Sequence, residues 1–105
     1  MGKLTVDFSR DSEALTFTLS GRIDATNAYS FSDAVASVLG EGKDEVVVFD
    51  CGSLEYISSM GLRVLLSLAK RRSSPIKLVN VSHEVMSILN ITGFSQIFDV
   101  AGGEE

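Results

Sequence analysis

Two adjacent serines are the residues of this 105-residue chain that are best placed for chemistry. Ser58 and Ser59 precede an apolar segment with helical periodicity, so both lie at or near the first turn of a helix. A hydroxyl there can cap the helix. A phosphate attached to it would be stabilised by backbone N–H groups that lack intrahelical partners and by the positive end of the helix dipole. The serines alone leave both interpretations open, a plain cap and a phosphorylation site.

Other groups that catalyse reactions or bind metals are scarce. His83 is the only histidine and Cys51 the only cysteine, so the chain cannot build an internal disulfide or a cysteine-rich metal site. A serine nucleophile would need a base held against it. The sequence contains no G-x-S-x-G elbow, P-loop or glycine-rich dinucleotide turn. We therefore expect no enzymatic activity, no metal and no cofactor.

The charge and the apolar pattern limit the possible partners. A formal net charge of -5 disfavours binding to nucleic acid or to an anionic bilayer. No apolar segment of signal-peptide length follows the N-terminus, and the apolar-rich stretch around 60–69 is too short to span a membrane. We expect a cytoplasmic protein that neither binds nucleic acid nor inserts directly into a membrane.

The first part of the chain has the pattern of a β-hairpin. Apolar and polar residues alternate over 4–8 and again over 15–20, which is the period of half-buried strands, and 9–13 is a polar turn. After Asp24 the period becomes helical, with Asp24 or Thr26 available as the cap, until Gly40 and Gly42. The apolar run 45–49 is typical of a central strand covered on both faces.

The second half alternates helices and strands. We expect a helix from Ser58 and Ser59 to about Arg72, a strand over 76–81, a helix from Ser82 to Gly93, and a short strand or helix over 94–100. The predicted fold is a single α/β domain with an N-terminal hairpin, a mixed sheet of four to five strands, three to four helices and right-handed crossovers. The domain spans 1–100, and 101–105 form a mobile tail.

The helix that begins at the two serines carries two apolar stripes. One is typical of a core face, and the other lies nearly opposite it. A second stripe must be covered by another element or offered to a partner, and its position beside Ser59 favours the partner. The alternative is one broad core face with Leu68 at its margin and Met60 under a loop. The core stripe consists of Leu62, Leu65, Leu66 and Ala69, and the second of Met60, Val64 and Leu68.

The segment 49–66 resembles the STAS domain of bacterial anti-sigma factor antagonists. The resemblance extends through 21–24, before the first helix, and through 91–94, after the third, so it covers nearly the whole chain. It implies the α/β fold derived above from periodicity. The residues that match the family pattern in order and spacing are Asp50, Leu54, Tyr56, Ile57, Ser58, Ser59, Gly61 and Leu62.

The resemblance implies a switch between partners. In the family, the serine at the position of Ser59 accepts a phosphoryl group from a serine kinase that is also the anti-sigma factor. The unmodified domain binds this kinase and frees the sigma factor, the phosphorylated domain releases it, and a phosphatase reverses the modification. Many members carry Asp where this chain has Ser58, so Ser58 is an alternative acceptor.

The resemblance and the second apolar stripe together predict a partner-binding surface around Ser59, while Asp50 is expected to order the Ser59 loop. One alternative function is a STAS subunit of a lipid transporter or signalling scaffold that works without phosphorylation. Another is a nucleotide-binding domain with a pocket near Ser59 lined by Asp24 and Asp50. The predicted partner-binding residues are Asp24, Thr26, Ser58, Ser59, Met60, Gly61, Arg63, Val64 and Leu68.

Overall fold

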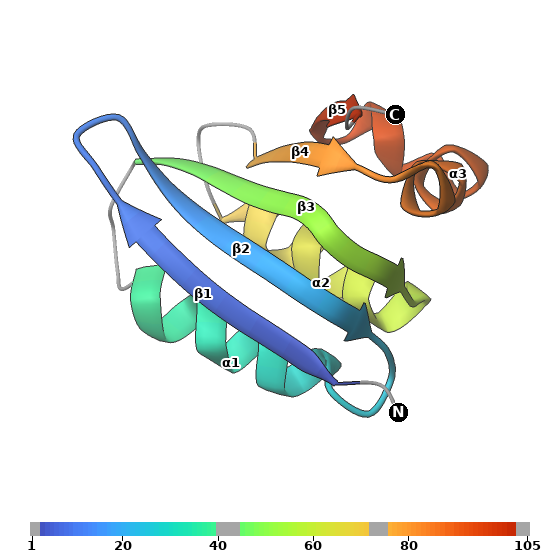
Figure 1. Ribbon diagram of the computed structural model, residues 1–105, viewed down its shortest axis with the longest axis horizontal. Helices are drawn as coiled ribbons and strands as arrows, with labels where there is room; N and C mark the ends of the chain where they lie inside the picture. Colours follow the sequence, from blue (N-terminus) through green and yellow to red (C-terminus); the bar gives the residue numbers. More distant parts are fainter. Residues whose placement is uncertain (1–2, 40–44, 72–75, 103–105) are drawn as a thin grey trace.

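The structure, a computed structural model, describes residues 3–39, 45–71 and 76–102 (Figure 1). It contains strands and helices in alternation after an opening pair of strands. The elements are β1 (Leu4–Arg10), β2 (Ala14–Ile23), α1 (Ala28–Leu39), β3 (Val46–Ile57), α2 (Ser59–Lys70), β4 (Ile76–Val81), α3 (His83–Thr92), the 3-10 helix η1 (Phe94–Gln96) and β5 (Asp99–Gly102).

The described strands form one mixed sheet in the order β1-β2-β3-β4-β5. β1 is antiparallel to β2, as a hairpin requires, and each later pair of neighbours is parallel. The predicted α/β domain with an N-terminal hairpin is therefore confirmed, and β3 is the central strand of the five.

The hairpin turn is closed by an aspartate. Asp11 Oδ1 accepts hydrogen bonds from the backbone N–H groups of Glu13 and Ala14, at 2.7 and 2.9 Å. These two bonds favour the charged carboxylate and lower the pKa of Asp11. The turn is thus fixed by a short acidic side chain, as in an Asx turn.

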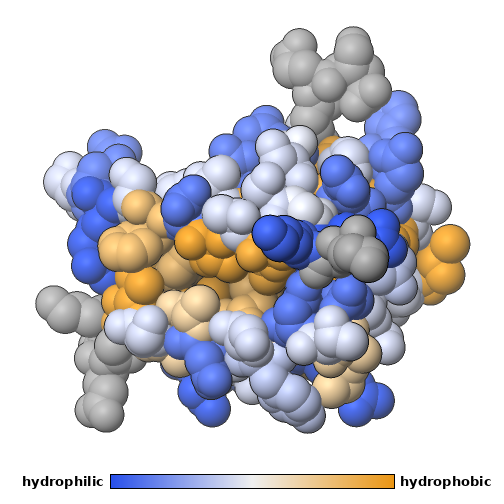
Figure 2. Space-filling view, turned by 60° about the horizontal axis from the view of Figure 1, so that its bottom comes forward, coloured by the Kyte–Doolittle hydropathy of each residue, from blue (hydrophilic) through white to orange (hydrophobic). Residues whose placement is uncertain are grey.

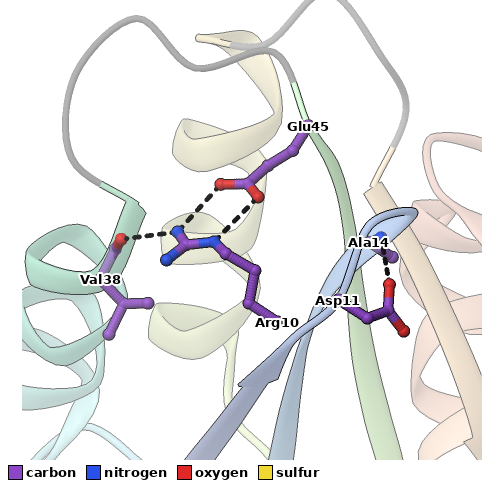
Figure 3. Close-up of polar contacts among 5 residues, drawn as sticks. All are labelled: Arg10, Asp11, Ala14, Val38 and Glu45. Carbon is purple, nitrogen blue, oxygen red and sulfur yellow. Dashed lines mark hydrogen bonds and ion pairs between the residues drawn. The ribbon is translucent and has the colours of Figure 1, made fainter.

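A salt bridge ties the hairpin to the elements that follow it (Figure 3). Both oxygens of the Glu45 carboxylate accept hydrogen bonds from the Arg10 guanidinium, each at 3.0 Å. The same guanidinium also donates to the carbonyl oxygen of Val38, at 3.2 Å. One side chain at the end of β1 thereby links the last turn of α1 with the residue that precedes β3.

The hydrophobic core lies on one face of the sheet. The register places Phe17, Phe49 and Leu78 side by side across β2, β3 and β4, and all three are buried. Phe31 of α1 packs edge-on against Phe49, with 6.0 Å between ring centroids. α1 packs against α2, so the two helices cover the same face (Figure 1).

The opposite face of the sheet is more open. Thr16, Val48 and Lys77 share the register row between the buried ones, and none of them is buried. The prediction that the strand at 45–49 is covered on both faces is therefore wrong, because Val48 is only half-buried. A continuous apolar run indicated a central strand correctly but could not report which of its faces a helix covers.

β3 also extends further than the sequence predicts. The strand was expected to end near Phe49 and to lead into a loop, yet it continues to Ile57 and pairs with β2 to the end, where Ile23 lies opposite Ile57. Two register shifts interrupt this pairing, at 18–20 and at 21–22. The Arg22 guanidinium lies over the ring of Tyr56, 4.6 Å from its centroid, and stabilises this second half of the strand.

The C-terminal part of the domain ends in a strand. The element predicted over 94–100 is a 3-10 helix followed by β5, which pairs with β4 and includes Ala101 and Gly102. These two residues therefore belong to the sheet and not to the predicted tail. Residues 103–105, the predicted stops Gly40 and Gly42 and the predicted helix end at Arg72 lie outside the described residues.

Partly buried hydrophobic side chains also reach the surface at the edge of the sheet. Figure 2 shows them gathered in a hollow where β1 lies beside α1. Leu4 and Val6 contribute to it from the strand, and Phe31 and Ala34 from the helix. The hollow is separate from the start of α2, where the two serines lie.

Candidate functional site

Ser58 caps α2. Its backbone is extended, with φ -84° and ψ 171°, and its Oγ accepts a hydrogen bond from the backbone N–H of Gly61, at 3.2 Å. The Ser58 backbone N–H donates to the carbonyl oxygen of Ile23, at 2.8 Å. The start of the helix is thereby attached to the end of β2.

Ser59 is the first residue of α2 and is exposed, whereas Ser58 is half-buried. Within 3–39, 45–71 and 76–102, no group forms a hydrogen bond with the Ser59 hydroxyl. The two serines therefore differ in availability: one hydroxyl accepts the capping bond, and its neighbour faces solvent at the positive end of the helix dipole.

Gly61 allows α2 to approach the sheet closely. A Cβ atom at this position would lie 2.6 Å from Ile23 Cγ2 and 2.8 Å from Ile57 Cγ1. Both isoleucines are buried, so they have no room to move aside. Gly61 is itself buried, and the prediction that it contacts a partner is corrected: it is a packing residue that sets the position of the helix start.

The second apolar stripe of α2 is largely internal. Leu68 is 5% exposed and Val64 9%, and both belong to the hydrophobic core. The prediction that Leu68 is offered to a partner is therefore wrong. α1 and α2 lie on the same face of the sheet and pack against each other, so α2 needs a broad apolar face that serves both the sheet and α1. Met60 is only half-buried, at the end of the stripe nearest Ser59.

A shallow depression lies between α1 and α2, close to Ser59, with a volume of about 250 Å³. Its apolar lining comes from Met60 and Val64 of α2 and from Tyr29 of α1, whose side chain is 70% exposed. The sequence reasoning missed Tyr29. The available signal was an aromatic residue that falls outside the periodic apolar positions of its helix. The complete lining is Tyr29, Ser32, Met60, Arg63, Val64 and Ser67.

The turn before α1 is organised by Asp24. Its Oδ1 accepts hydrogen bonds from the hydroxyl and the backbone N–H of Thr26, at 2.6 and 2.9 Å, and from the Asn27 backbone N–H at 3.3 Å. The bond from the Thr26 hydroxyl is the main cause that lowers the pKa of Asp24. α1 begins at Ala28, so Asp24 and Thr26 stabilise the preceding turn and do not cap the helix. Because Ile23 holds the backbone of Ser58, this turn lies beside the start of α2.

Asp50 lies elsewhere. Its Oδ1 accepts hydrogen bonds from the Gly52 backbone N–H, at 3.0 Å, and from Asn80 Nδ2, at 3.1 Å. It precedes Ile57 by seven residues in one strand, which corresponds to about 23 Å at about 3.3 Å per residue. The prediction that Asp50 orders the Ser59 loop is therefore wrong: it joins β3 to the end of β4.

Comparison with known proteins identifies the family. Residues 5–104 match the STAS domain. The chain belongs to the STAS domain family. Among the curated relatives of this STAS domain is BtrV of Bordetella bronchiseptica, named as a candidate anti-sigma factor antagonist, with 35% identity over 98% of this chain and 89% of the relative. The anti-sigma-B factor antagonist of Bacillus subtilis is 23% identical over 97% of this chain and 94% of its own length.

Solved structures share the fold of this STAS domain. An anti-sigma factor antagonist from Mycobacterium paratuberculosis superposes with a TM-score of 0.83 at 19% identity, over 94% of this chain and 86% of that one. Unphosphorylated SpoIIAA, also an anti-sigma factor antagonist, gives a TM-score of 0.75 at 15% identity, over 94% and 88% of the two chains. The observed architecture is thus the SpoIIAA-like fold.

Three further observations concern groups outside the site of this STAS domain. In the part of the chain that the structure describes, no three His, Cys, Asp or Glu residues lie together in a way that could hold a metal ion. No helix in these same residues is long and apolar enough to cross a membrane. The Cys51 thiol is buried in β3, and burial raises its pKa to about 12.

Proposed function

We propose that this STAS domain is a non-enzymatic anti-sigma factor antagonist that binds an anti-sigma serine kinase in the bacterial cytoplasm and releases it when Ser59 is phosphorylated. The observation that carries the proposal is the exposed hydroxyl of Ser59 at the first position of α2, beside a serine that already provides the cap. The relatives named as anti-sigma factor antagonists support an anti-sigma factor as the partner.

The modification is a phosphoryl transfer. The Ser59 Oγ attacks the γ-phosphorus of ATP, the bond to the bridging oxygen of ADP breaks, and the hydroxyl proton is lost to the kinase or to solvent. Hydrolysis of the phosphoserine by a phosphatase restores the hydroxyl. The domain itself provides only the acceptor oxygen.

Phosphorylation at this position should leave the domain folded. A phosphoserine adds a charge of about -1.5 to -2, and the first turn of a helix stabilises such a charge through unpaired N–H groups and the dipole. The effect therefore falls on the complex. A dianion in the interface must be desolvated, and it repels any acidic group of the kinase that faces it.

The nucleotide-binding alternative gains no support from the site. Neither Asp24 nor Asp50 is among the described residues that line the depression beside Ser59. A larger hollow, of about 510 Å³, is lined by Glu55 of β3 and Glu84 of α3, whose carboxylates would repel nucleotide phosphates. The chain also lacks a phosphate-binding glycine loop.

The test is binding to the cognate kinase, recovered with the tagged protein from its own cells and identified by mass spectrometry. Ser59→Asp should weaken binding by at least tenfold, about 1.4 kcal/mol in binding free energy. Ser59→Ala should bind like the parent but acquire no phosphate from ATP and the kinase. Isothermal titration calorimetry measures the affinities, and intact-mass spectrometry measures the phosphate.

Ser87→Asp is the matched control, because it adds the same charge at an exposed position on α3. It should bind like the parent. Equal affinities for the parent and Ser59→Asp, with no phosphate on Ser59, would refute the switch and favour a STAS subunit that works without phosphorylation.

A further inference from the structure

Arg63 is a cation at the edge of the depression that has no partner in the described structure. It is exposed, and no hydrogen bond or ion pair joins its guanidinium to any of the described residues. Two other arginines are engaged: Arg10 binds Glu45, and Arg22 stacks on Tyr56. Unlike these two arginines, Arg63 has a guanidinium that is available to a partner.

The depression combines this cation with an apolar lining. Arg63 is the only charged residue among the described residues that line it. The exposed Tyr29 and the half-buried Met60 provide its accessible hydrophobic surface, while Val64 is almost fully buried. Its volume of about 250 Å³ is below the range typical of small-molecule pockets. A side chain of a protein partner is a better fit than a cofactor. The charge complement of the guanidinium is a carboxylate, which it can bind through two parallel hydrogen bonds.

Arg63 also lies within reach of Ser59. The two residues are four positions apart in α2, so they are neighbours on one helix face, with about 5–6 Å expected between their Cβ atoms. The order of the two residues is also favourable, because phosphorylated Ser59 is an acidic group that lies N-terminal to the basic Arg63. A phosphate on Ser59 could accept two hydrogen bonds from the guanidinium.

We infer that Arg63 is the charged anchor of the partner interface: it binds an Asp or Glu side chain of the kinase that lies next to an apolar side chain seated in the depression. Phosphate on Ser59 then captures the same guanidinium. This inference rests on the proposed function, and it adds the chemistry of the partner and a second cause of release. Phosphorylation repels the partner and also removes the cation to which its carboxylate was bound.

The capture is tested without any partner. Full-length protein with phosphoserine at position 59, made by genetic encoding, is titrated with pH and followed by phosphorus NMR. Pairing with Arg63 should lower the pKa of the second phosphate ionisation, relative to Arg63→Gln, by about 0.3 units or more. Arg63→Lys should restore part of the shift. Equal pKa values in the parent and Arg63→Gln would overturn the capture.

The anchor is tested with the unmodified protein and the kinase. Arg63→Gln should weaken binding by at least fivefold, and its dissociation constant should depend less on NaCl concentration than that of the parent, because one charge pair is lost. Arg71→Gln, which removes a cation just beyond the other end of α2, is the control and should bind like the parent. Circular dichroism confirms that each variant is folded.

The outcomes separate the two proposals. If Ser59→Asp weakens binding while Arg63→Gln binds like the parent, the anchor is refuted and the phosphorylation switch stands. If Arg63→Gln weakens binding while Ser59→Asp has no effect, the proposed function fails and a carboxylate-binding surface remains. If Arg71→Gln weakens binding as much as Arg63→Gln, the effect is one of net charge and the anchor is refuted.

Discussion

At the scale of single residues, the site depends on a division of roles between two neighbouring hydroxyl groups. Ser58 accepts the capping bond from Gly61 and is held to β2 through its backbone, while the side chain of Ser59 faces solvent. If Ser58 were modified, the bulky phosphate would replace the capping hydroxyl in a half-buried position. The geometry therefore favours Ser59 over Ser58 as the acceptor.

This division predicts different effects on stability. Ser58→Ala removes the cap and should lower the free energy of unfolding by about 1 kcal/mol. Ser59→Ala removes an exposed hydroxyl that has no hydrogen-bond partner among the described residues, and it should change the free energy of unfolding by less than about 0.5 kcal/mol. Urea denaturation followed by circular dichroism measures both values. Ser58→Asp should recover most of the loss, since aspartate is also a good cap. Equal losses for the two alanine variants would contradict the division.

The position of the two serines at a helix start could be predicted from the sequence, because capping residues and apolar periodicity are local patterns. The acceptor position itself came from the spacing of Tyr56, Ile57, Gly61 and Leu62 around the serines, through a family resemblance. Asp24 or Thr26 was predicted to cap the first helix. The hydrogen bonds of Asp24 instead stay within the turn before the helix, and α1 begins only at Ala28. The partner of Asp50 could not be predicted, since Asn80 is thirty residues away in the sequence.

At the scale of elements, the site depends on how closely α2 approaches the ends of β2 and β3. Gly61 makes this approach possible, because a side chain there would collide with Ile23 and Ile57. The same contact holds the start of the helix, and hence Ser59, in place. A glycine that first appeared as part of a partner surface is thus a structural requirement of the site.

Gly61→Ala should therefore destabilise the domain by about 1–3 kcal/mol, the usual cost of overpacking a rigid core. It should also shift the backbone NMR resonances of Ser58 and Ser59. Gly93→Ala is the comparison: apart from its two chain neighbours, no atom of the described residues lies within 4 Å of its added Cβ, so the cost comes from its φ of +82°. That variant should leave the resonances at the start of α2 unchanged. A Gly61→Ala protein as stable as the parent would show that the helix can move outward freely.

Elements were predictable where a local period defines them. β4 and α3 follow their expected limits, and Ser82 and Gly93 bound α3 as expected. The hairpin also forms as predicted, although both of its strands are longer than expected, at 4–10 and 14–23. The second half of β3 was missed because Gly52 and Ser53 interrupt the apolar pattern, and its pairing with β2 depends on tertiary contacts and a shifted register. The two stripes of α2 were recognised, but periodicity alone could not tell that Leu68 is buried in the core.

At the scale of the whole molecule, the helices α1 and α2 cover one face of the sheet, and the core between them forms a single cluster that includes the central strand. Cys51 lies in this strand, 2% exposed, and its Sγ donates a weak hydrogen bond to the carbonyl oxygen of Phe49, at 3.6 Å. Burial is the main cause that raises the pKa of this thiol to about 12, with a smaller contribution from the charge of Asp50. The thiol is therefore protonated and shielded at neutral pH.

Cys51 should consequently report the opening of the entire domain. At pH 8, we expect its reaction with a disulfide reagent such as DTNB to be limited by the rare population of open molecules, because a central strand is exposed only when the sheet and helices separate. The ratio of the labelling rate in the folded protein to that in the urea-unfolded chain gives a free energy of opening. This free energy should equal the free energy of unfolding from urea denaturation. Gly61→Ala should speed labelling about tenfold for each 1.4 kcal/mol of destabilisation. Labelling much faster than the rate of global unfolding allows would show that β3 opens locally. The end of β3 would then not hold Ser59 rigidly in place.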